Sequence, residues 1–542
     1  MSSHEQNISE ILVSLTDVAK FAKTSKSAVS NWRKRYKDFP VPRVEQPSGA
    51  LFDLAEVEEW LIKTGRLTSR VPQRELFWNV ASSLRDQGSP DQISRFVIAL
   101  ILYVTVCERA AEAGSDLKVE PRDSWQEVSK VHDWELMDAV ARAVHSIENA
   151  NPQLERMISV GLERLDFRDR RDFGKSIRVI AANAEHRPGL DESDDLFDEV
   201  FEWRESFDRF LAESSTPNDL AILMSLIAAS FGPRVFDPAA GDAGVLLLTA
   251  QMHDAGDART PEGVKRQGGP RELLGYEVNP SVLWLARARM FLYGQKATLE
   301  VTNSLLEPSV QGVAADVVVV DPPFGMKDWG DARTILDPRW EFGGPPARSA
   351  DFAWLQVAWQ ALRPGGVALV LLPQGSLFRQ GAESEIRRNM LRAGAVSAIV
   401  SLPAKMRTNT SIKCVLWVLQ RPETPTVKTS QVLLIDATDM GKPGRRQHDF
   451  ASEELEAIAD VVVQHAYGLA PDPLSKVPLK LVPSDPQLAH DLSYLMASVS
   501  EAALPLEAAT EDASTLRTEL TTAVVELDRA LGVILTSAEE ER

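Results

Sequence analysis

The sequence predicts an α/β fold in which a largely parallel sheet of seven strands is preceded by a helical region and a small N-terminal unit. Short β-branched segments alternate with segments of helical apolar spacing from about residue 214 to residue 464. Several short segments end in an acidic residue or a proline, where a chain leaves a sheet. The 542 residues exceed one ordinary domain. We therefore divide the chain into residues 1–66, 67–213, 214–469 and 470–542, the last a helical tail.

Composition and charge limit the classes of function. The formal net charge is −19 at pH 7, so any contact with nucleic acid must use local basic surfaces. No apolar run reaches the ~18–20 residues that a membrane helix needs, and the polar first residues do not resemble a signal peptide. Cys107 and Cys414 form no metal-binding pattern. We expect reduced thiols, a cytoplasmic location, no metal site and no contact with a membrane.

The N-terminal unit, residues 1–66, is expected to contain two short helices joined by a turn. Residues 15–22 have amphipathic spacing, and Ser25 can cap the second helix. Seven basic residues and no acidic residue occur between Lys20 and Lys37. This charge distribution favours a local contact with DNA, although a unit that docks another protein is the alternative.

Residues 47–52 and 53–61 are expected to add a wing and a closing helix to this unit. It therefore resembles the winged or excisionase-like helix-turn-helix domains. Small polar residues followed by a basic run suit entry into the major groove and contacts with phosphates. The candidate DNA-contacting residues are Lys26, Ser27, Asn31, Arg33, Lys34 and Arg35.

The second region, residues 67–213, is expected to be all-helical. Its motifs indicate no chemistry, so we expect it to shape a cleft or to dock a partner. Apolar residues recur at helical spacing in residues 75–84, 90–113, 124–146, 151–164 and 191–211.

The α/β region opens with features that suit a bound cofactor. Its first strand ends at Asp237, and the small residues that follow let the backbone approach a ligand at a helix N-terminus. The second strand ends at Glu277, and an acidic residue at this place grips a ribose diol in doubly wound folds. The candidate cofactor-binding residues are Thr216, Pro217, Asp237, Pro238, Ala239, Gly241, Gly244, Glu277, Asn303 and Ser304.

The fourth strand, residues 317–320, ends in the candidate catalytic residues Asp321, Pro322, Pro323 and Phe324. Proline cannot continue a central strand, so the chain leaves the sheet here. The Asp321 carboxylate and the Pro322 carbonyl can accept hydrogen bonds from an exocyclic amine, and Phe324 can stack on a flat ring. An ordinary turn after a strand is the alternative for an isolated match of this length.

The remaining strands are expected at residues 367–372, 396–402 and 414–419, with residues 431–435 as an added edge strand. A loop rather than a helix joins the last pair. Arg379 and Asn409 lie in loops and are candidates for the path of a base or a DNA backbone, with loop structure as the alternative. In the tail, residues 510–535 have the spacing of an amphipathic helix, which can pack on its own body or dock a helical partner.

These motifs, in this order, resemble the class I S-adenosylmethionine-dependent DNA adenine-N6 methyltransferases, and within them the modification subunit of type I restriction–modification systems. The resemblance covers about residues 214–464. It rests on Thr216-Pro217, Asp237-Pro238-Ala239-Ala240-Gly241, Glu277-Val278-Asn279-Pro280, Asp321-Pro322-Pro323-Phe324, Pro364-Gly365-Gly366, residues 372–379 and Thr408-Asn409-Thr410.

The resemblance implies a Rossmann-like domain that binds S-adenosyl-L-methionine and methylates adenine N6 in double-stranded DNA by base flipping. It also implies a separate specificity subunit and a restriction or other defence subunit as partners. The family usually has glycine where this chain has Ala243, threonine at Asp242, cysteine at Ala240 and more often asparagine at Asp321. A DNA-binding regulator with a degenerate methyltransferase domain, and methylation of another amine such as a glutamine side chain or an RNA base, are the alternatives.

Overall fold

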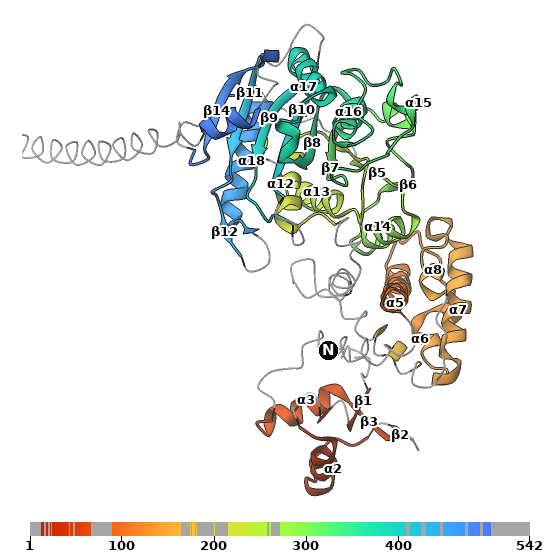
Figure 1. The fold of residues 1–542 in the computed structure, drawn as a ribbon. Coiled ribbons are helices and arrows are strands. Elements are labelled where there is room, and N and C mark those ends of the chain that lie inside the picture. Colours follow the sequence, from red (N-terminus) through yellow and green to blue (C-terminus); the bar gives the residue numbers. More distant parts are fainter. Residues whose placement is uncertain are drawn as a thin grey trace, which may run out of the picture. The chain divides into compact units, whose positions relative to one another are not determined.

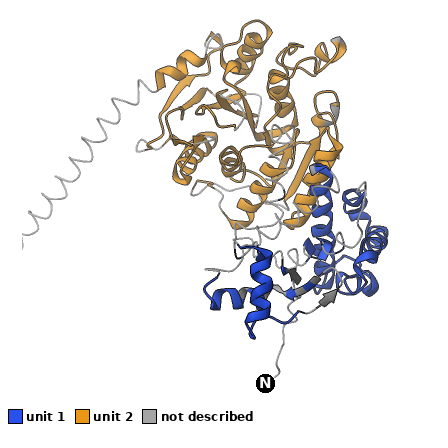
Figure 2. Ribbon diagram, turned by 60° about the horizontal axis from the view of Figure 1, so that its bottom comes forward, with its two compact units in different colours: residues 1–212 blue, residues 213–542 orange. Residues whose placement is uncertain are grey.

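The structure, a computed structural model, divides into two compact units, residues 1–212 and 213–542 (Figure 2). This boundary falls beside the predicted start of the α/β region. The residues described are 12–15, 18–19, 22, 24–42, 44–46, 49–66, 89–163, 174, 176–178, 180–181, 200, 215–256, 259–261, 271–407, 412–423, 430–444, 448–471, 475–487 and 492–499.

The first part of unit 1 combines a short sheet with helices. Strands β1 (Leu12–Ser14), β3 (Gly49–Asp53) and β2 (Val44–Gln46) pair antiparallel in that order. Helices α2 (Lys26–Arg35) and α3 (Leu54–Lys63) accompany them. The Ser25 hydroxyl accepts a hydrogen bond from the Ala28 amide, which confirms the predicted cap of α2. The shared core consists of Val18, Ala19, Val29, Phe39, Phe52, Val57, Trp60 and Leu61.

The second part of unit 1 is helical where it is described, although two predicted helices are broken. Its elements are α5 (Pro90–Ala111), η1 (Pro121–Asp123), α6 (Trp125–Val128), α7 (Asp133–Ala150), η2 (Pro152–Leu154) and α8 (Ser159–Leu162). The helices predicted at residues 124–146 and 151–164 are therefore each divided into two shorter elements. Arg178 explains the first break, because its guanidinium donates to the carbonyl oxygens of Ser129 and Val131 between α6 and α7.

Unit 2 contains a sheet of nine strands in the order β14-β11-β9-β10-β8-β7-β4-β5-β6 (Figure 1). The seven strands expected from the sequence are all present. Six run parallel and β10 runs antiparallel between β8 and β9. Their bounds are β4 (Arg234–Asp237), β5 (Glu272–Glu277), β6 (Thr298–Val301), β7 (Ala315–Val320), β8 (Leu362–Pro373), β9 (Val396–Ser401) and β10 (Cys414–Gln420).

The far side of the sheet differs from the prediction. Strand β11 (Gln431–Asp436) is not an edge strand, because it lies between β9 and β14. Strand β14 (Leu479–Pro483) comes from the region predicted to be a helical tail. Residues 492–499 are helical and bury Leu492, Met496 and Val499 in the same core as the sheet. The predicted helix at residues 510–535 lies outside the described residues.

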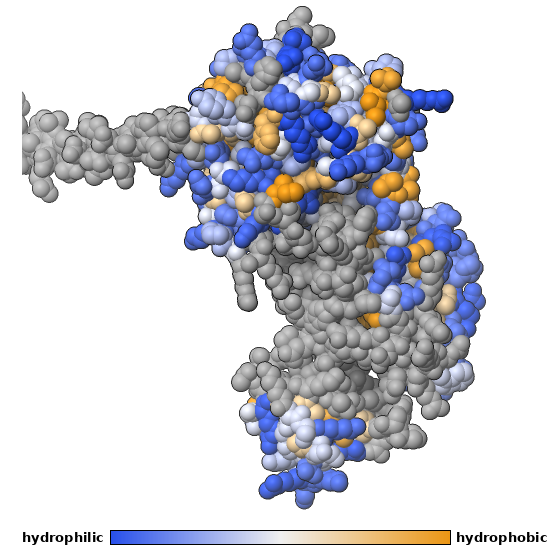
Figure 3. All heavy atoms as spheres, viewed as in Figure 1, coloured by the Kyte–Doolittle hydropathy of each residue, from blue (hydrophilic) through white to orange (hydrophobic). Residues whose placement is uncertain are grey.

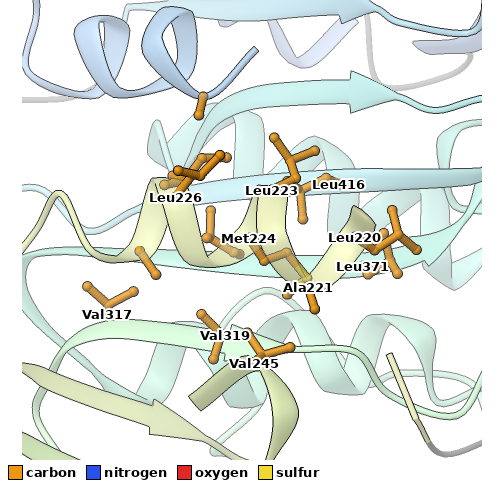
Figure 4. Packing of buried hydrophobic residues seen from close by; sticks show 14 of the residues in the cluster. Leu220, Ala221, Leu223, Met224, Leu226, Val245, Val317, Val319, Leu371 and Leu416 are labelled. Atoms are coloured by element: carbon orange, nitrogen blue, oxygen red, sulfur yellow. The ribbon is translucent and has the colours of Figure 1, made fainter. Parts of the chain in front are cut away.

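Helices cover both faces of the sheet. Val317 and Val319 of β7 belong to one apolar cluster, shown in Figure 4, whereas Val318 and Val320 belong to a second cluster on the opposite face. Burial on both faces explains the run of valines. The principal helices are α12 (Asn218–Ala228), α13 (Gly244–Ala255), α14 (Pro280–Leu292), α16 (Asp351–Ala361), α17 (Ala382–Ala393) and α18 (Ser452–Ala466).

Smaller elements complete unit 2. They are η3 (Pro308–Gly312), α15 (Ala332–Ile335), η4 (Gln374–Leu377), β12 (Lys442–Pro443) and β13 (His448–Asp449). On the face seen in Figure 3, hydrophobic side chains are scattered among hydrophilic ones. Among the described helices, none combines the length and the hydropathy that crossing a membrane requires.

Candidate active site

Three acidic residues lie together at the carboxyl ends of neighbouring strands, because β4, β5 and β7 run parallel side by side. Asp237 ends β4, Glu277 ends β5, and Asp321 follows β7 directly. The loops that leave these strands therefore share the crevice in which open α/β sheets bind ligands. The sequence motifs for a cofactor and for a flat amine lie together here.

Hydrogen bonds from backbone amides fix the loop between Asp237 and Gly244. The Ala239 amide donates to Asp237 Oδ1 over 2.9 Å, and the Ala240 amide donates to the Tyr276 carbonyl over 2.8 Å. Gly241 adopts a φ of 52°. This left-handed conformation lets the loop turn at the edge of the sheet without steric cost.

Ala243 adopts the left-handed conformation in spite of its side chain. Its φ is 62°, its side chain is fully buried, and it immediately precedes α13. This backbone conformation costs an alanine about 1 kcal/mol more than a glycine. The replacement of the family's usual glycine therefore leaves the turn intact, and the surrounding packing holds it in place.

Glu277 links the second strand to this loop. Its Oε2 accepts from the Gly241 amide over 3.1 Å, and its Oε1 accepts from the Asn279 amide over 2.7 Å. Each carboxylate oxygen has a second lone pair, so the group can still accept from ribose hydroxyls. Glu277 thus fits the role of ribose acceptor predicted from its position.

Asn303 and Ser304 support the site without offering their polar groups freely. The Ser304 hydroxyl donates to the Pro238 carbonyl over 2.6 Å, and Asn303 Oδ1 accepts from the Leu305 amide over 3.1 Å. Ser304 is buried, so it holds the cofactor loop from behind.

An ion pair that the sequence did not predict stabilises the loop. Asp242 pairs with Arg289 of α14, and both side chains are largely buried. Asp242 also accepts from the Gly244 amide over 3.1 Å. Arg289 lies 47 residues further along the chain, so no local pattern marks it as the partner of Asp242.

Asp321 is held in an ion pair at the candidate catalytic position. Its side chain is 4% exposed, and its Oδ1 accepts from the guanidinium of Arg407. The Thr216 hydroxyl also hydrogen-bonds Asp321. The guanidinium carbon of Arg407 lies 4.7 Å from the centre of the Phe324 ring. One arginine therefore joins the acceptor and the ring of the catalytic motif.

Arg407 was missed from the sequence because it stands 86 residues beyond Asp321. A basic residue in the loop that joins the last two predicted strands was the only available sign. The candidate Asn409, two residues later, lies outside the described residues. Of the two prolines, Pro322 is buried and Pro323 is exposed.

Arg379 lies beside the site but is engaged by acidic groups of the protein. Its Nη1 donates to Asp351 Oδ2 over 2.5 Å and lies 3.4 Å from Glu383 Oε1. Asp351 is fully buried, and its Oδ1 accepts from the Gly325 amide over 3.0 Å. Through Asp351, Arg379 thus supports the turn that follows Phe324, while its side chain is 31% exposed and its contact with a base or a DNA backbone stays a prediction.

The electrostatics of the site are dominated by buried carboxylates. Burial raises the pKa of Asp237 well above its ordinary value, and repulsion from Asp321, Glu277 and Asp242 raises it further. Burial likewise raises the pKa of Glu277. Burial raises the pKa of Asp321 too, while Arg407 and the Thr216 hydroxyl act in the opposite direction. A cationic ligand would relieve this repulsion.

The predicted DNA-contacting residues of unit 1 lie on α2, where most are exposed. Arg33 is the exception, since it is half-buried and its guanidinium lies 5.4 Å from the centre of the Phe52 ring. The exposed residues are Lys26, Ser27, Asn31, Lys34 and Arg35. Within the described ranges, no group of histidine, cysteine and acidic side chains is arranged to hold a metal ion.

Comparison with known sequences identifies a matching family and several relatives. The family described as N-6 DNA Methylase matches residues 192–476. The HindI type I restriction enzyme methylase subunit of Haemophilus influenzae is 31% identical over 258 residues, which cover 46% of this chain and 55% of that protein. The MjaIX methylase subunit of Methanocaldococcus jannaschii is 24% identical and covers 71% of this chain and 75% of the relative.

Solved structures show the same fold. The methyltransferase subunit of a type I restriction–modification system from Streptococcus thermophilus superposes with a TM-score of 0.58 and 21% identity, covering 76% of this chain and 95% of that one. A modification subunit of a type I restriction enzyme from Vibrio vulnificus gives a TM-score of 0.55 and 15% identity over 76% of this chain and 92% of the other. At these identities the likeness establishes the fold alone.

Proposed function

Because the chain belongs to the N-6 DNA methylase family, we propose that it transfers a methyl group from S-adenosyl-L-methionine to adenine N6 in DNA. The observation that supports this most directly is the position of Asp321 and Phe324. They lie at the end of a central strand, beside the loop and the Glu277 carboxylate that suit the cofactor. An acceptor, a flat ring and a nucleotide-binding edge thus occupy one crevice.

The chain's own residues would hold the cofactor by complementary charge and shape. Glu277 accepts from the ribose hydroxyls, and the turn at Gly241 lets the backbone come close. The bound cofactor supplies an electrophilic methyl group on a cationic sulfonium. The buried carboxylates of Asp237 and Glu277 favour that positive charge. The fit explains why these acidic side chains lie together.

The target base would leave the DNA stack, because N6 cannot be reached inside a base pair. Phe324 stacks on the extruded adenine, while Asp321 and the Pro322 carbonyl accept hydrogen bonds from the amino group. These bonds would favour a pyramidal, nucleophilic nitrogen, to which the bound cofactor would supply the methyl group. Asp321 would be placed to receive the proton that N6 loses. Positioning supplies most of the rate increase.

The relatives suggest a role in an assembly. Several are named as methylase subunits of type I restriction enzymes, so we assign this chain the role of modification subunit. A separate specificity subunit selects the DNA sequence, and a restriction or other defence subunit accompanies it. The exposed basic residues of α2 add a local contact with double-stranded DNA. A cytoplasmic location is part of the same proposal.

Expression in a host that lacks N6-methyladenine tests the proposal. The full chain is produced alone and with its genomic neighbours, and modified bases are detected by sequencing. We expect methylated adenines in one sequence context. Asp321→Ala should abolish them, whereas Asp321→Asn, which keeps a hydrogen-bond acceptor, should retain measurable activity.

Binding of S-adenosyl-L-methionine to the purified chain provides an independent arm of this test. The strained turn at Ala243 favours one competing function, a DNA-binding regulator that has lost its cofactor site. Calorimetry at millimolar cofactor separates the two functions. Absence of binding would exclude the methyltransferase and favour the regulator, and methylation that persists in Asp321→Ala would refute the site assignment.

A further inference from the structure

Arg407 occupies two of the three groups that the catalytic motif offers to a base. Its guanidinium donates to Asp321 Oδ1 and lies 4.7 Å from the centre of the Phe324 ring. The side chains of Arg407 and Asp321 are 13% and 4% exposed, respectively. The contact is therefore largely shielded from water, unlike a surface ion pair, and both of its parts involve residues of the proposed active site.

A guanidinium group resembles the amino edge of adenine in the features that matter here. It is planar, it donates hydrogen bonds from NH2 groups in its plane, and it stacks on aromatic faces. Asp321 would accept from the N6 amino group in the same way, and Phe324 would stack on the purine. An adenine and the Arg407 guanidinium cannot both fill this space.

Further contacts hold Phe324 and Arg407 in place. Phe324 packs against the apolar cluster of the sheet, and Arg407 covers part of the remaining surface of its ring. The guanidinium also interacts with the thiol of Cys414, which is fully buried at the start of β10. Arg407 is thus held by β10 as well as by the segment that follows β7.

We infer that Arg407 is a place-holder for the target adenine, and that the extruded base must displace its side chain from Asp321 and Phe324. The inference rests on the proposed function, since it takes adenine as the ligand of this motif. It adds a residue that controls entry of the base. The aspartate at position 321 is what attracts the guanidinium, because an asparagine at this position, which is more frequent in the resembled family, carries no charge to pair with it.

Displacement has a thermodynamic consequence. If most molecules hold Arg407 in the pocket, only the remaining fraction accepts the base, and the apparent affinity for DNA falls by that fraction. Removing the guanidinium should make every molecule competent. The KM for DNA should then decrease, whereas kcat, which is set after the base has entered, should change less.

Steady-state methylation tests this inference. Transfer of labelled methyl groups to unmethylated genomic DNA is measured for the wild type, Arg407→Ala and Arg421→Ala, in whichever complex shows activity. We expect Arg407→Ala to lower the KM for DNA by roughly threefold to tenfold, the scale of a partly desolvated cation–π contact. Arg421 is a matched control, since its guanidinium lies 5.6 Å from the Trp359 ring away from Asp321, and its removal should leave KM unchanged.

Three outcomes would contradict the inference. An increased KM would mean that Arg407 contacts DNA, an unchanged KM would mean that it does not occupy the base site, and a fall in kcat alone would make it a catalytic residue. If Arg407→Ala does not fold, Arg407→Lys keeps the ion pair but loses the planar surface and should lower KM by a smaller factor. Absence of transfer by the wild type would instead overturn the proposed function, and this inference with it.

Discussion

The cofactor-binding half and the target-base half of the candidate active site differ in what their carboxylates bind. On the cofactor half, Asp237 and Glu277 are held by backbone amides. On the target half, Asp321 and Asp351 each pair with an arginine. The cofactor half therefore presents negative charge that a cationic ligand can neutralise, whereas arginines already neutralise the carboxylates of the target half.

This difference indicates what each ligand must do on binding. A sulfonium cofactor adds the missing positive charge and should bind without displacing a side chain. A neutral base brings no charge, so it must compete with a guanidinium that is already in place. Asp242 and Arg289 are the exception on the cofactor half, and their pairing stabilises the loop rather than the ligand.

The largest expected effect comes from removing an arginine of the target half. Arg379→Met leaves the fully buried Asp351 without its cation. We expect the free energy of unfolding to fall by about 2–3 kcal/mol, toward the lower end of the range for a buried pair because Arg379 is 31% exposed. Denaturant unfolding of the full chain measures this change.

Arg348→Met is the control for that experiment. Arg348 is exposed on the neighbouring loop and donates to the Gln380 carbonyl. Its loss should change stability by less than about 0.5 kcal/mol. Equal effects of the two variants would contradict the proposed contrast, because pairing with Asp351 would then contribute nothing specific to stability.

The cofactor half should respond mainly in ligand affinity. Glu277→Gln removes a buried charge, but its NH2 group cannot accept from one of the two amides that Glu277 binds, so the free energy of unfolding should change by less than about 2 kcal/mol. The affinity for S-adenosyl-L-methionine should fall by roughly tenfold or more, since charge-assisted hydrogen bonds to the ribose are lost. Calorimetry provides both values, and Glu300→Gln, an exposed position on β6, is the matched control.

A smaller effect should follow from pH. Burial raises the pKa of Glu277 above 4.5, so the folded state binds this proton more tightly than the unfolded chain does. Its contribution to stability is present at low pH and is lost as pH rises through the raised pKa. Cofactor binding requires the ionised form, so affinity should fall on acidification, by at most about tenfold per pH unit for one proton.

Proton release on cofactor binding checks the sign of this effect. The binding enthalpy measured near the raised pKa should depend on the ionisation enthalpy of the buffer. Glu277→Gln should reduce this dependence, and the remainder should come from Asp237, whose pKa is also raised. Uptake of protons on binding would contradict the proposed role of the ionised carboxylate.

The strands and their acidic ends could be predicted from sequence because they depend on local patterns. The valines of β7 and the prolines after Asp321 identify a buried strand and its end within a few residues. Ser25, Asp237 and Glu277 were likewise recognisable from their immediate neighbours. The observed register then brings the predicted motifs to one edge, which follows from parallel pairing.

The missed features all depend on contacts between distant segments. Arg289 and Arg407 each neutralise a carboxylate from another strand–helix unit, and Arg178 interrupts a helix through carbonyls about 50 residues earlier. Strand β14 was missed although β4 and β6 are shorter, and its pairing partner β11 lies far back in the sequence. Spacing along the sequence does not indicate which arginine pairs with which carboxylate.

The addition of β14 also affects how the molecule resists self-association. An uncovered sheet edge is a template on which a neighbouring chain can add a strand. Here β14 covers the edge of β11 and carries Lys480 and a terminal Pro483, while the opposite edge, β6, has four residues and exposes Glu300. Short edges, a charge on each and a proline all hinder strand addition. The sheet is therefore protected at both ends against aggregation as the protein accumulates in the cell.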